Sequence, residues 1–211
     1  MKPEKFLEEI QWYLDTYEID IETVTSDNIS FENYEQLLWG NDIFCFRFGA
    51  TRGCFIPEEY NPSFIFKFDL ADLWEEYCEN EREIYQKAKA QGLEKCFAKI
   101  QKFDKIYNTW LYKCEYVDKL EENAPFKPLS EEELNKLLTI ESSHQGGRRP
   151  PSSWASRFIE YHGADTYDKF LTFINAHGVN DLHTSNIGYI KGRPVVLDYA
   201  GFFEPSGSSC N

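Results

Sequence analysis

The chain has 211 residues, of which 42% are hydrophobic and 17% aromatic, so it can bury a substantial core as one large domain or two small lobes. Its formal net charge of -14 repels a phosphate backbone, which argues against nucleic acid as a partner. The first residues, "MKPEKFLEEIQWYLD", lack the apolar core of a signal peptide, and no apolar run approaches the roughly 20 residues that span a bilayer. We therefore expect a cytoplasmic protein without a membrane partner.

The cysteines agree with this expectation. They lie at positions 45, 54, 78, 96, 114 and 210, with no C-x-x-C pair and no histidine at zinc-ligand spacing. Reduced thiols in the cytoplasm are the simplest interpretation, and a scattered disulfide set in a secreted protein is the alternative.

Residues 1–40 predict a helical extension at the N-terminus. Five apolar residues share one face of a helix over residues 3–17, namely Phe6, Ile10, Tyr13, Leu14 and Tyr17. A second, short helix is predicted over residues 31–39, with Ser30 as its N-cap and Gly40 as its stop. We expect this extension to pack on the small lobe formed by residues 41–118.

Residues 41–118 predict a small lobe built on an antiparallel sheet. The segments "DIFCFRF", "GCFIP" and "SFIFKFDL" are short, rich in aromatic residues and punctuated by Gly and Pro, as in a β-meander. A long helix over residues 72–91, closed by Gly92, follows the third strand, and two further strands are predicted in "CFAKI" and "TWLYKCEYV". The predicted fold class is therefore α+β.

Residues 119–211 predict a reduced and mostly helical second lobe. Ser130 and Glu133 fit a capping box at the start of one helix. The segment "SSHQGGRRPPSS" reads as a loop, and two more helices are predicted over residues 154–161 and 166–177.

The segment "NDLHTSNIGYIKGRPVVLDYAG" carries most of the chemistry that the sequence offers. It places Asp181, Asn186 and Asp198 around a predicted ribbon of two strands, turned at Lys191 and Gly192. The strands, over residues 187–190 and 194–197, would bring these side chains close together. Converging oxygen ligands of this kind suit Mg²⁺. The alternative is that Asp181 and Asn186 are turn residues that form Asx-turns.

This segment resembles the catalytic loop and metal-binding segment of the protein-kinase-like superfamily, whose pattern is D-[LI]-x-x-x-N followed by apolar-apolar-D. The triplet "DLH" is more similar to the aminoglycoside and choline kinase branch than to the eukaryotic protein kinases. The resemblance implies a two-lobe fold that uses ATP and Mg²⁺. It implies that Asp181 is the catalytic base that orients the acceptor hydroxyl, and that Asn186 and Asp198 hold the metal.

A member of this superfamily also needs a lysine on the third strand of its small lobe. Lys67 lies in "SFIFKFDL", where strand alternation places Ile65 and Lys67 on one face. By the resemblance, Ile65 would be an apolar neighbour of adenine and Lys67 would bind phosphate. The alternative is a solvent-facing strand lysine.

The lysine requires an acidic partner on the following helix. Helical spacing places Glu81 on the apolar face that also carries Ile84, Tyr85 and Ala88, whereas Glu83 points elsewhere. We therefore predict that Glu81 pairs with Lys67. The alternative is an ordinary solvated carboxylate.

Two weaker features complete the nucleotide site that the resemblance implies. Gly49 and Gly53 in "RFGATRGCF" would form a phosphate-binding loop to which Arg52 adds charge, although the pattern departs from G-x-G-x-x-G and a plain hairpin explains it as well. Glu115 and Val117 would offer backbone groups to adenine at a hinge between the lobes.

The expected function is transfer of the γ-phosphate of ATP to a hydroxyl of a protein or small molecule. Two departures from the family weaken this expectation: only "YAGFFEPSGSSCN" follows Asp198, which gives no room for acceptor-binding helices, and Asn180 stands where Arg or Gly is usual. The alternatives are a nucleotide-binding pseudokinase that acts as an interaction module, and a nucleotidyl (AMP) transferase. The sequence does not identify the acceptor.

Overall fold

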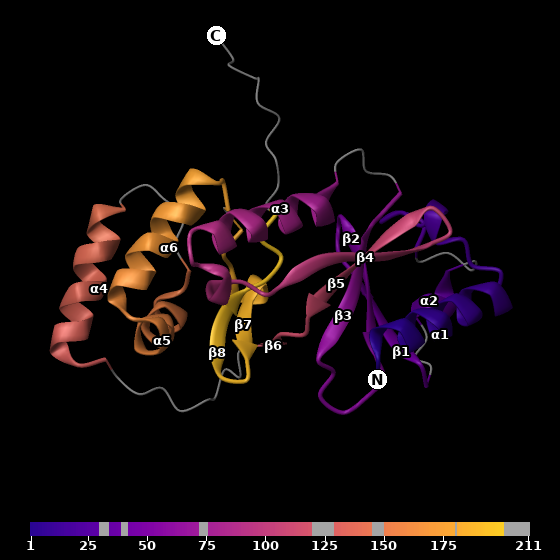
Figure 1. The fold of residues 1–211 in the computed structure, drawn as a ribbon, viewed down its shortest axis with the longest axis horizontal. Helices are drawn as coiled ribbons and strands as arrows, with labels where there is room; N and C mark the ends of the chain where they lie inside the picture. Colours follow the sequence, from indigo (N-terminus) through magenta and orange to yellow (C-terminus); the bar gives the residue numbers. More distant parts are fainter. Residues whose placement is uncertain are drawn as a thin grey trace, which may run out of the picture. The chain divides into compact units, whose positions relative to one another are not determined.

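The computed structural model describes residues 1–29, 34–38, 42–71, 76–119, 129–144, 150–179 and 181–200. These residues form an α+β protein with six α-helices, a 5-stranded antiparallel sheet and a 3-stranded sheet (Figure 1). The chain divides into two compact units. The first unit joins Met1–Glu83 to Lys99–Tyr116, and the second joins Ile84–Ala98 to Val117–Asn211.

This division differs from the expected boundaries, and the second unit resumes at Val117 instead of residue 119. The N-terminal extension belongs to the same unit as the 5-stranded sheet, and the helix after the third strand, α3 (Tyr77–Ala90), contributes its first half to one unit and its second half to the other. Helix α3 also begins later than residue 72, because Glu76 is not helical, while residues 72–75 lie outside the described part.

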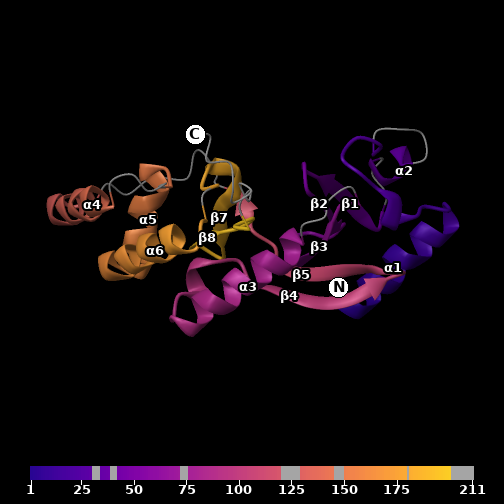
Figure 2. The same ribbon diagram turned by 90° about the horizontal axis from the view of Figure 1, so that it is seen from above.

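The 5-stranded sheet has the order β1-β2-β3-β5-β4, with every neighbouring pair antiparallel. Its strands are β1 (Phe44–Phe48), β2 (Arg52–Pro57), β3 (Phe64–Asp69), β4 (Ile100–Ile106) and β5 (Thr109–Glu115). The strands β4 and β5 lie side by side (Figure 2). The predicted meander, interrupted by a helix after its third strand, is therefore confirmed.

The fourth strand does not lie where the sequence predicts it. Glu94–Cys96 form a 3-10 helix, and β4 begins only at Ile100, the last residue of "CFAKI", and continues to Ile106. A bulge between Lys102 and Asp104 shifts the register against β5. Because a bulge breaks the two-residue alternation of a strand, β4 lacks the pattern by which it could be recognised.

The N-terminal extension shares the core of the sheet. Helix α1 (Pro3–Thr16) packs Phe6 against the sheet, with ring centroids 5.8 Å from Phe64 and 5.5 Å from Phe66. Full burial of each such ring stabilises the fold by roughly 1.5–3 kcal/mol. The expected packing of the extension on the sheet is therefore confirmed. Of the second predicted helix, α2 (Glu35–Leu38) is described, whereas Ser30 and Gly40 lie outside the described residues.

The second unit contains three helices that pack together: α4 (Glu131–Ser143), α5 (Ser152–His162) and α6 (Ala164–Ala176) (Figure 1). The predicted capping box is confirmed, because the Ser130 hydroxyl accepts from the Glu133 N–H and the Glu133 carboxylate accepts from the Ser130 N–H. The loop predicted between α4 and α5 includes residues 145–149, which lie outside the described part.

The predicted ribbon is present as β7 (Ile187–Ile190) and β8 (Arg193–Val196). Its turn residues, Lys191 and Gly192, have φ angles of 51° and 80°, which is the left-handed conformation of the tight hairpin turn that matches strand twist. A short strand, β6 (Asp118–Lys119), adds to β7 and was not predicted. A strand this short has no periodicity to recognise.

Two further expectations concern the environment of the protein. Cys45, Cys54, Cys78, Cys96 and Cys114 are thiols, and Cys210 lies outside the described residues. In the described part of the chain, no helix combines the length and apolar character needed to cross a membrane.

Candidate functional site

Lys67 is buried in the first unit. Its strand, β3, turns Phe64, Phe66 and Phe68 into the core that it shares with α1, so Lys67 lies on the opposite face. The residue is only 5% exposed. The interpretation of Lys67 as a solvent-facing strand lysine is therefore wrong.

Glu81 is the partner of this lysine. The Lys67 Nζ atom donates to both carboxylate oxygens of Glu81, each at 3.1 Å, and Glu81 is 1% exposed. Ile84, Tyr85 and Ala88 are buried on the same face of α3, whereas Glu83 is exposed. The predicted contact is present, and the alternative of a solvated carboxylate is wrong.

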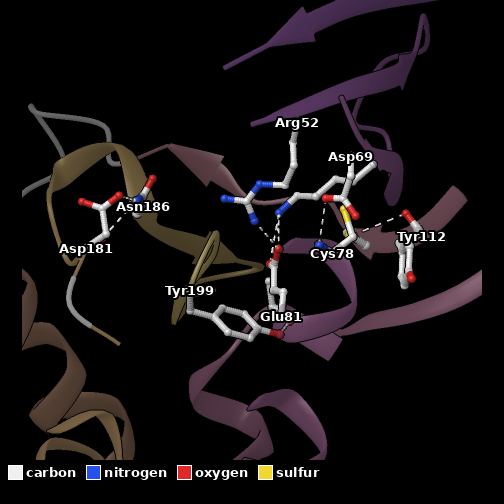
Figure 3. Close-up of polar contacts among 11 residues, drawn as sticks. Arg52, Asp69, Cys78, Glu81, Tyr112, Asp181, Asn186 and Tyr199 are labelled. Atoms are coloured by element: carbon white, nitrogen blue, oxygen red, sulfur yellow. Dashed lines mark hydrogen bonds and ion pairs between the residues drawn. The ribbon is translucent and has the colours of Figure 1, made fainter. Parts of the chain in front are cut away.

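Arg52 joins the same carboxylate. Its Nη1 atom donates to Glu81 Oε2 at 2.9 Å, and Figure 3 shows the guanidinium pointing at Glu81. We call Arg52, Lys67 and Glu81 the cation–carboxylate centre. The contact of Arg52 with Glu81 was not predicted. The alternation along β2 could have indicated it, because Arg52 and Cys54 share a face and Cys54 lies opposite Lys67 in the register.

Further polar contacts hold the start of α3 against the sheet. The Cys78 N–H donates to Asp69 Oδ1 at 3.0 Å, and the Tyr112 hydroxyl donates to Glu79 Oε2 at 2.9 Å (Figure 3). Burial raises the pKa of the Asp69 carboxyl, and it raises the pKa of the Cys78 thiol well above its ordinary value. Cys78 is fully buried, as structural thiols are.

An apolar surface adjoins the cation–carboxylate centre on the same face of the sheet. Ile65 lies two residues before Lys67 on β3, and Cys54 and Ile56 alternate with the core residues of β2. These three side chains are half-buried, in contrast to the fully buried phenylalanines of the other face. Ile65 therefore has the environment that an apolar contact with an adenine ring would need.

The two glycines of the predicted phosphate loop have structural roles instead. The Gly49 N–H donates to the Arg52 carbonyl at 2.9 Å, which closes the β1–β2 hairpin. Gly53 lies within β2, and a Cβ atom added there would be 2.5 Å from the Phe68 ring and 3.0 Å from the Phe46 ring. The hairpin interpretation accounts for both glycines.

The structure also differs from the prediction at the two hinge residues, Glu115 and Val117. The Glu115 N–H donates to the Lys99 carbonyl at 2.9 Å, so this donor is used within the protein and is not offered to a nucleotide. The Glu115 carboxylate accepts from the Lys99 N–H at 2.8 Å. Val117 belongs to the second unit, where its side chain packs closely on Gly188.

In the second unit, Asp181 and Asn186 are bound to each other. The Asn186 Nδ2 atom donates to the Asp181 main-chain carbonyl at 2.9 Å and to its Oδ2 atom at 3.0 Å (Figure 3). The His183 Nε2 atom lies 3.2 Å from Asp181 Oδ1. Side chains therefore orient the carboxylate on both of its oxygens, which differs from an Asx-turn, where a main-chain N–H would be the donor.

Asp198 is brought beside Asn186 by the ribbon. The Leu197 N–H donates to the Asn186 carbonyl at 2.9 Å, and Asp198 is the next residue. The φ angle of Asp198 is 58°, a left-handed conformation that is uncommon outside glycine. The following residue is fixed, since the Tyr199 hydroxyl donates to the Ala98 carbonyl at 2.8 Å. Backbone conformations of this kind concentrate at functional sites.

Two side chains of this loop, Asn186 and Asp198, carry oxygen atoms of the kind that Mg²⁺ binds. Because the amide nitrogen of Asn186 is used for Asp181, its remaining polar atom is the oxygen Oδ1, and Asp198 adds a carboxylate. Mg²⁺ is commonly held by one or two carboxylate or amide oxygens and completes its shell with water and phosphate. Within the described ranges, no group of three or more His, Cys, Asp or Glu residues could hold a metal by itself.

Comparison with known proteins gives no support from similarity. No protein family, no curated protein and no solved structure matches this chain. Asn180 and residues 201–211, which carry the two departures from the family pattern, lie outside the described residues.

Proposed function

We propose that this chain is an ATP-dependent phosphotransferase with a protein-kinase-like two-lobe fold, which transfers the γ-phosphate to a hydroxyl of a protein or small molecule. The observation that carries the proposal is the buried ion pair of Lys67 and Glu81. A buried ion pair contributes little net stability, because desolvation offsets the attraction between the charges. A lysine held at this depth therefore calls for a functional explanation, and phosphate binding supplies one.

In this proposal the first unit binds the nucleotide. Lys67 contacts phosphate oxygens, and Glu81 fixes the position of the ammonium group. The half-buried face around Ile65 accepts the adenine ring. Phosphoryl transfer depends mainly on positioning and charge neutralisation, so a rigidly held cation is the contribution that the protein has to make.

The loop of the second unit that carries Asp181, Asn186 and Asp198 binds the acceptor and the metal in this proposal. Asp181 accepts a hydrogen bond from the acceptor hydroxyl and takes its proton, while Asn186 and His183 hold the carboxylate in place. Asn186 Oδ1 and the Asp198 carboxylate would hold Mg²⁺. When bound, the metal would neutralise negative charge on the phosphates.

The partners in this proposal are a nucleotide and a cytoplasmic protein or small molecule with a hydroxyl group. Nucleic acid is not a proposed partner, because the charge of -14 opposes it. A membrane is not a proposed partner either.

The test uses ATP labelled on its γ- or α-phosphate, with Mg²⁺ and the full chain. The label is followed on the chain itself, on added hydroxyl-bearing test acceptors and in released phosphate. Transfer or release of the γ-label supports the proposal. Transfer of the α-label would instead indicate a nucleotidyl transferase, and nucleotide binding without either transfer would indicate a pseudokinase.

Asp181→Asn makes the test specific. We expect the transfer rate to fall about 10²- to 10⁴-fold with nearly unchanged ATP affinity, because Asp181 acts on the acceptor and not on the nucleotide. Asp165→Asn is the control, since this exposed residue lies in the first turn of α6. Wild-type transfer by the Asp181 variant would show that the base is assigned incorrectly.

A further inference from the structure

Arg52 and Lys67 contact the same oxygen atom. Glu81 Oε2 accepts from Arg52 Nη1 at 2.9 Å and from Lys67 Nζ at 3.1 Å, so two cationic nitrogens are held as close neighbours. Like charges repel, and the repulsion is strong where water is largely excluded. Two cations around one carboxylate leave a net positive charge, which suits a negatively charged ligand.

The three side chains of the cation–carboxylate centre differ in how much of each is exposed to solvent. The side chain of Arg52 is 12% exposed, against 6% for Lys67 and 2% for Glu81. Glu81 therefore lies deepest and Arg52 lies closest to solvent. The Cζ atom of Arg52 also lies 5.9 Å from the centroid of the Tyr77 ring. Asp69 is the residue opposite Arg52 in the β2–β3 register. Burial raises the pKa of the Asp69 carboxyl, while the nearby Arg52 acts in the opposite direction.

The hairpin that precedes Arg52 departs from a glycine-rich phosphate loop. The Gly49 N–H closes the hairpin, and the missing side chain of Gly53 makes room for the Phe68 ring. These contacts favour side chains as the phosphate-binding groups of this unit. A guanidinium is well suited to it, because its planar donors match two phosphate oxygens.

We infer that Arg52 is a phosphate-binding residue that acts with Lys67 on the polyphosphate of the nucleotide, in the role that backbone amides of a glycine-rich loop would otherwise have. This inference rests on the proposed function and specifies how the first unit recognises its substrate. It predicts that Arg52 contributes to affinity for ATP and not to affinity for adenosine, which lacks phosphate.

The test measures ATP and adenosine binding by calorimetry with the full chain and Mg²⁺. For Arg52→Gln we expect ATP affinity to fall about 10- to 100-fold, the usual effect of losing a charged hydrogen bond, with adenosine affinity unchanged. Arg52→Lys keeps the charge, and we expect it to retain ATP affinity within about tenfold. Arg47→Gln is the control, because Arg47 is an exposed arginine on the neighbouring strand β1.

The outcomes separate this inference from the proposed function. If Arg52→Gln binds ATP as tightly as the wild-type chain, and the wild-type chain binds ATP and transfers phosphate, the inference is wrong and the proposed function stands. Equal loss of ATP and adenosine affinity, with a lower melting temperature, would overturn it by showing that Arg52 only anchors α3. If the wild-type chain binds no ATP, the proposed function fails and the inference fails with it.

Discussion

Glu81 is the residue on which the first unit depends most. It accepts hydrogen bonds from two buried or nearly buried cations and is itself 1% exposed. Such a carboxylate costs free energy to desolvate, and its removal leaves both cations without the charge that balances them. The energetic effect of a substitution should therefore be far larger at Glu81 than at other carboxylates of the same helix.

Glu81→Gln tests this expectation. We expect the free energy of unfolding to fall by about 3 kcal/mol, because Lys67 and Arg52 lose the charge that compensates their burial. Glu83→Gln, on the exposed face of α3, should change it by no more than about 0.5 kcal/mol. Urea denaturation measures both. Equal effects of the two substitutions would mean that the ion pair is not buried as described.

At the scale of single elements, the two glycines of the β1–β2 hairpin allow a role in packing to be tested apart from a role in ligand binding. Gly53 has the Phe68 ring 2.5 Å from the place of a Cβ atom, whereas nothing lies within 4 Å of that place at Gly49. The two glycines are close in sequence and lie in the same hairpin. They therefore form a matched pair for substitution.

We expect Gly53→Ala to destabilise the fold by about 1–3 kcal/mol, as overpacking of a core does, and Gly49→Ala to have little effect. The melting temperature of each variant provides the measurement. A Gly53→Ala variant that is as stable as wild type but binds ATP weakly would restore the phosphate loop that the sequence suggested.

The same elements show what the sequence could predict. Helix α6, the capping box of α4 and the β7–β8 ribbon carry local patterns, so they were predicted close to their observed bounds. The Lys67–Glu81 contact followed from two periodicities and a family resemblance. The strand β4 was misplaced because of its bulge, and the contact of Arg52 with Glu81 was missed because it joins residues distant in sequence.

At the scale of the whole molecule, the net charge of -14 affects every binding measurement. Self-repulsion destabilises a compact acidic chain, and added cations screen it. Mg²⁺ or salt alone should therefore raise the melting temperature without any specific site. A shift caused by MgATP has meaning only against a control at equal ionic strength.

With that control, we expect MgATP at about 100 times its Kd to add about 2.7 kcal/mol to the free energy of unfolding. Mg²⁺ alone and sodium chloride at equal ionic strength give the baseline. In Asp198→Asn the part of the shift that requires Mg²⁺ should be lost. A shift with MgATP that does not exceed the baseline would count against nucleotide binding.

The left-handed backbone at Asp198 decides which substitution is informative there. Asparagine tolerates this conformation and has nearly the same shape as aspartate, so exchanging one for the other removes a charge and little else. Alanine would add a backbone penalty of about 1–2 kcal/mol at the same position. Asp198→Ala would thus merge a chemical defect with a conformational one.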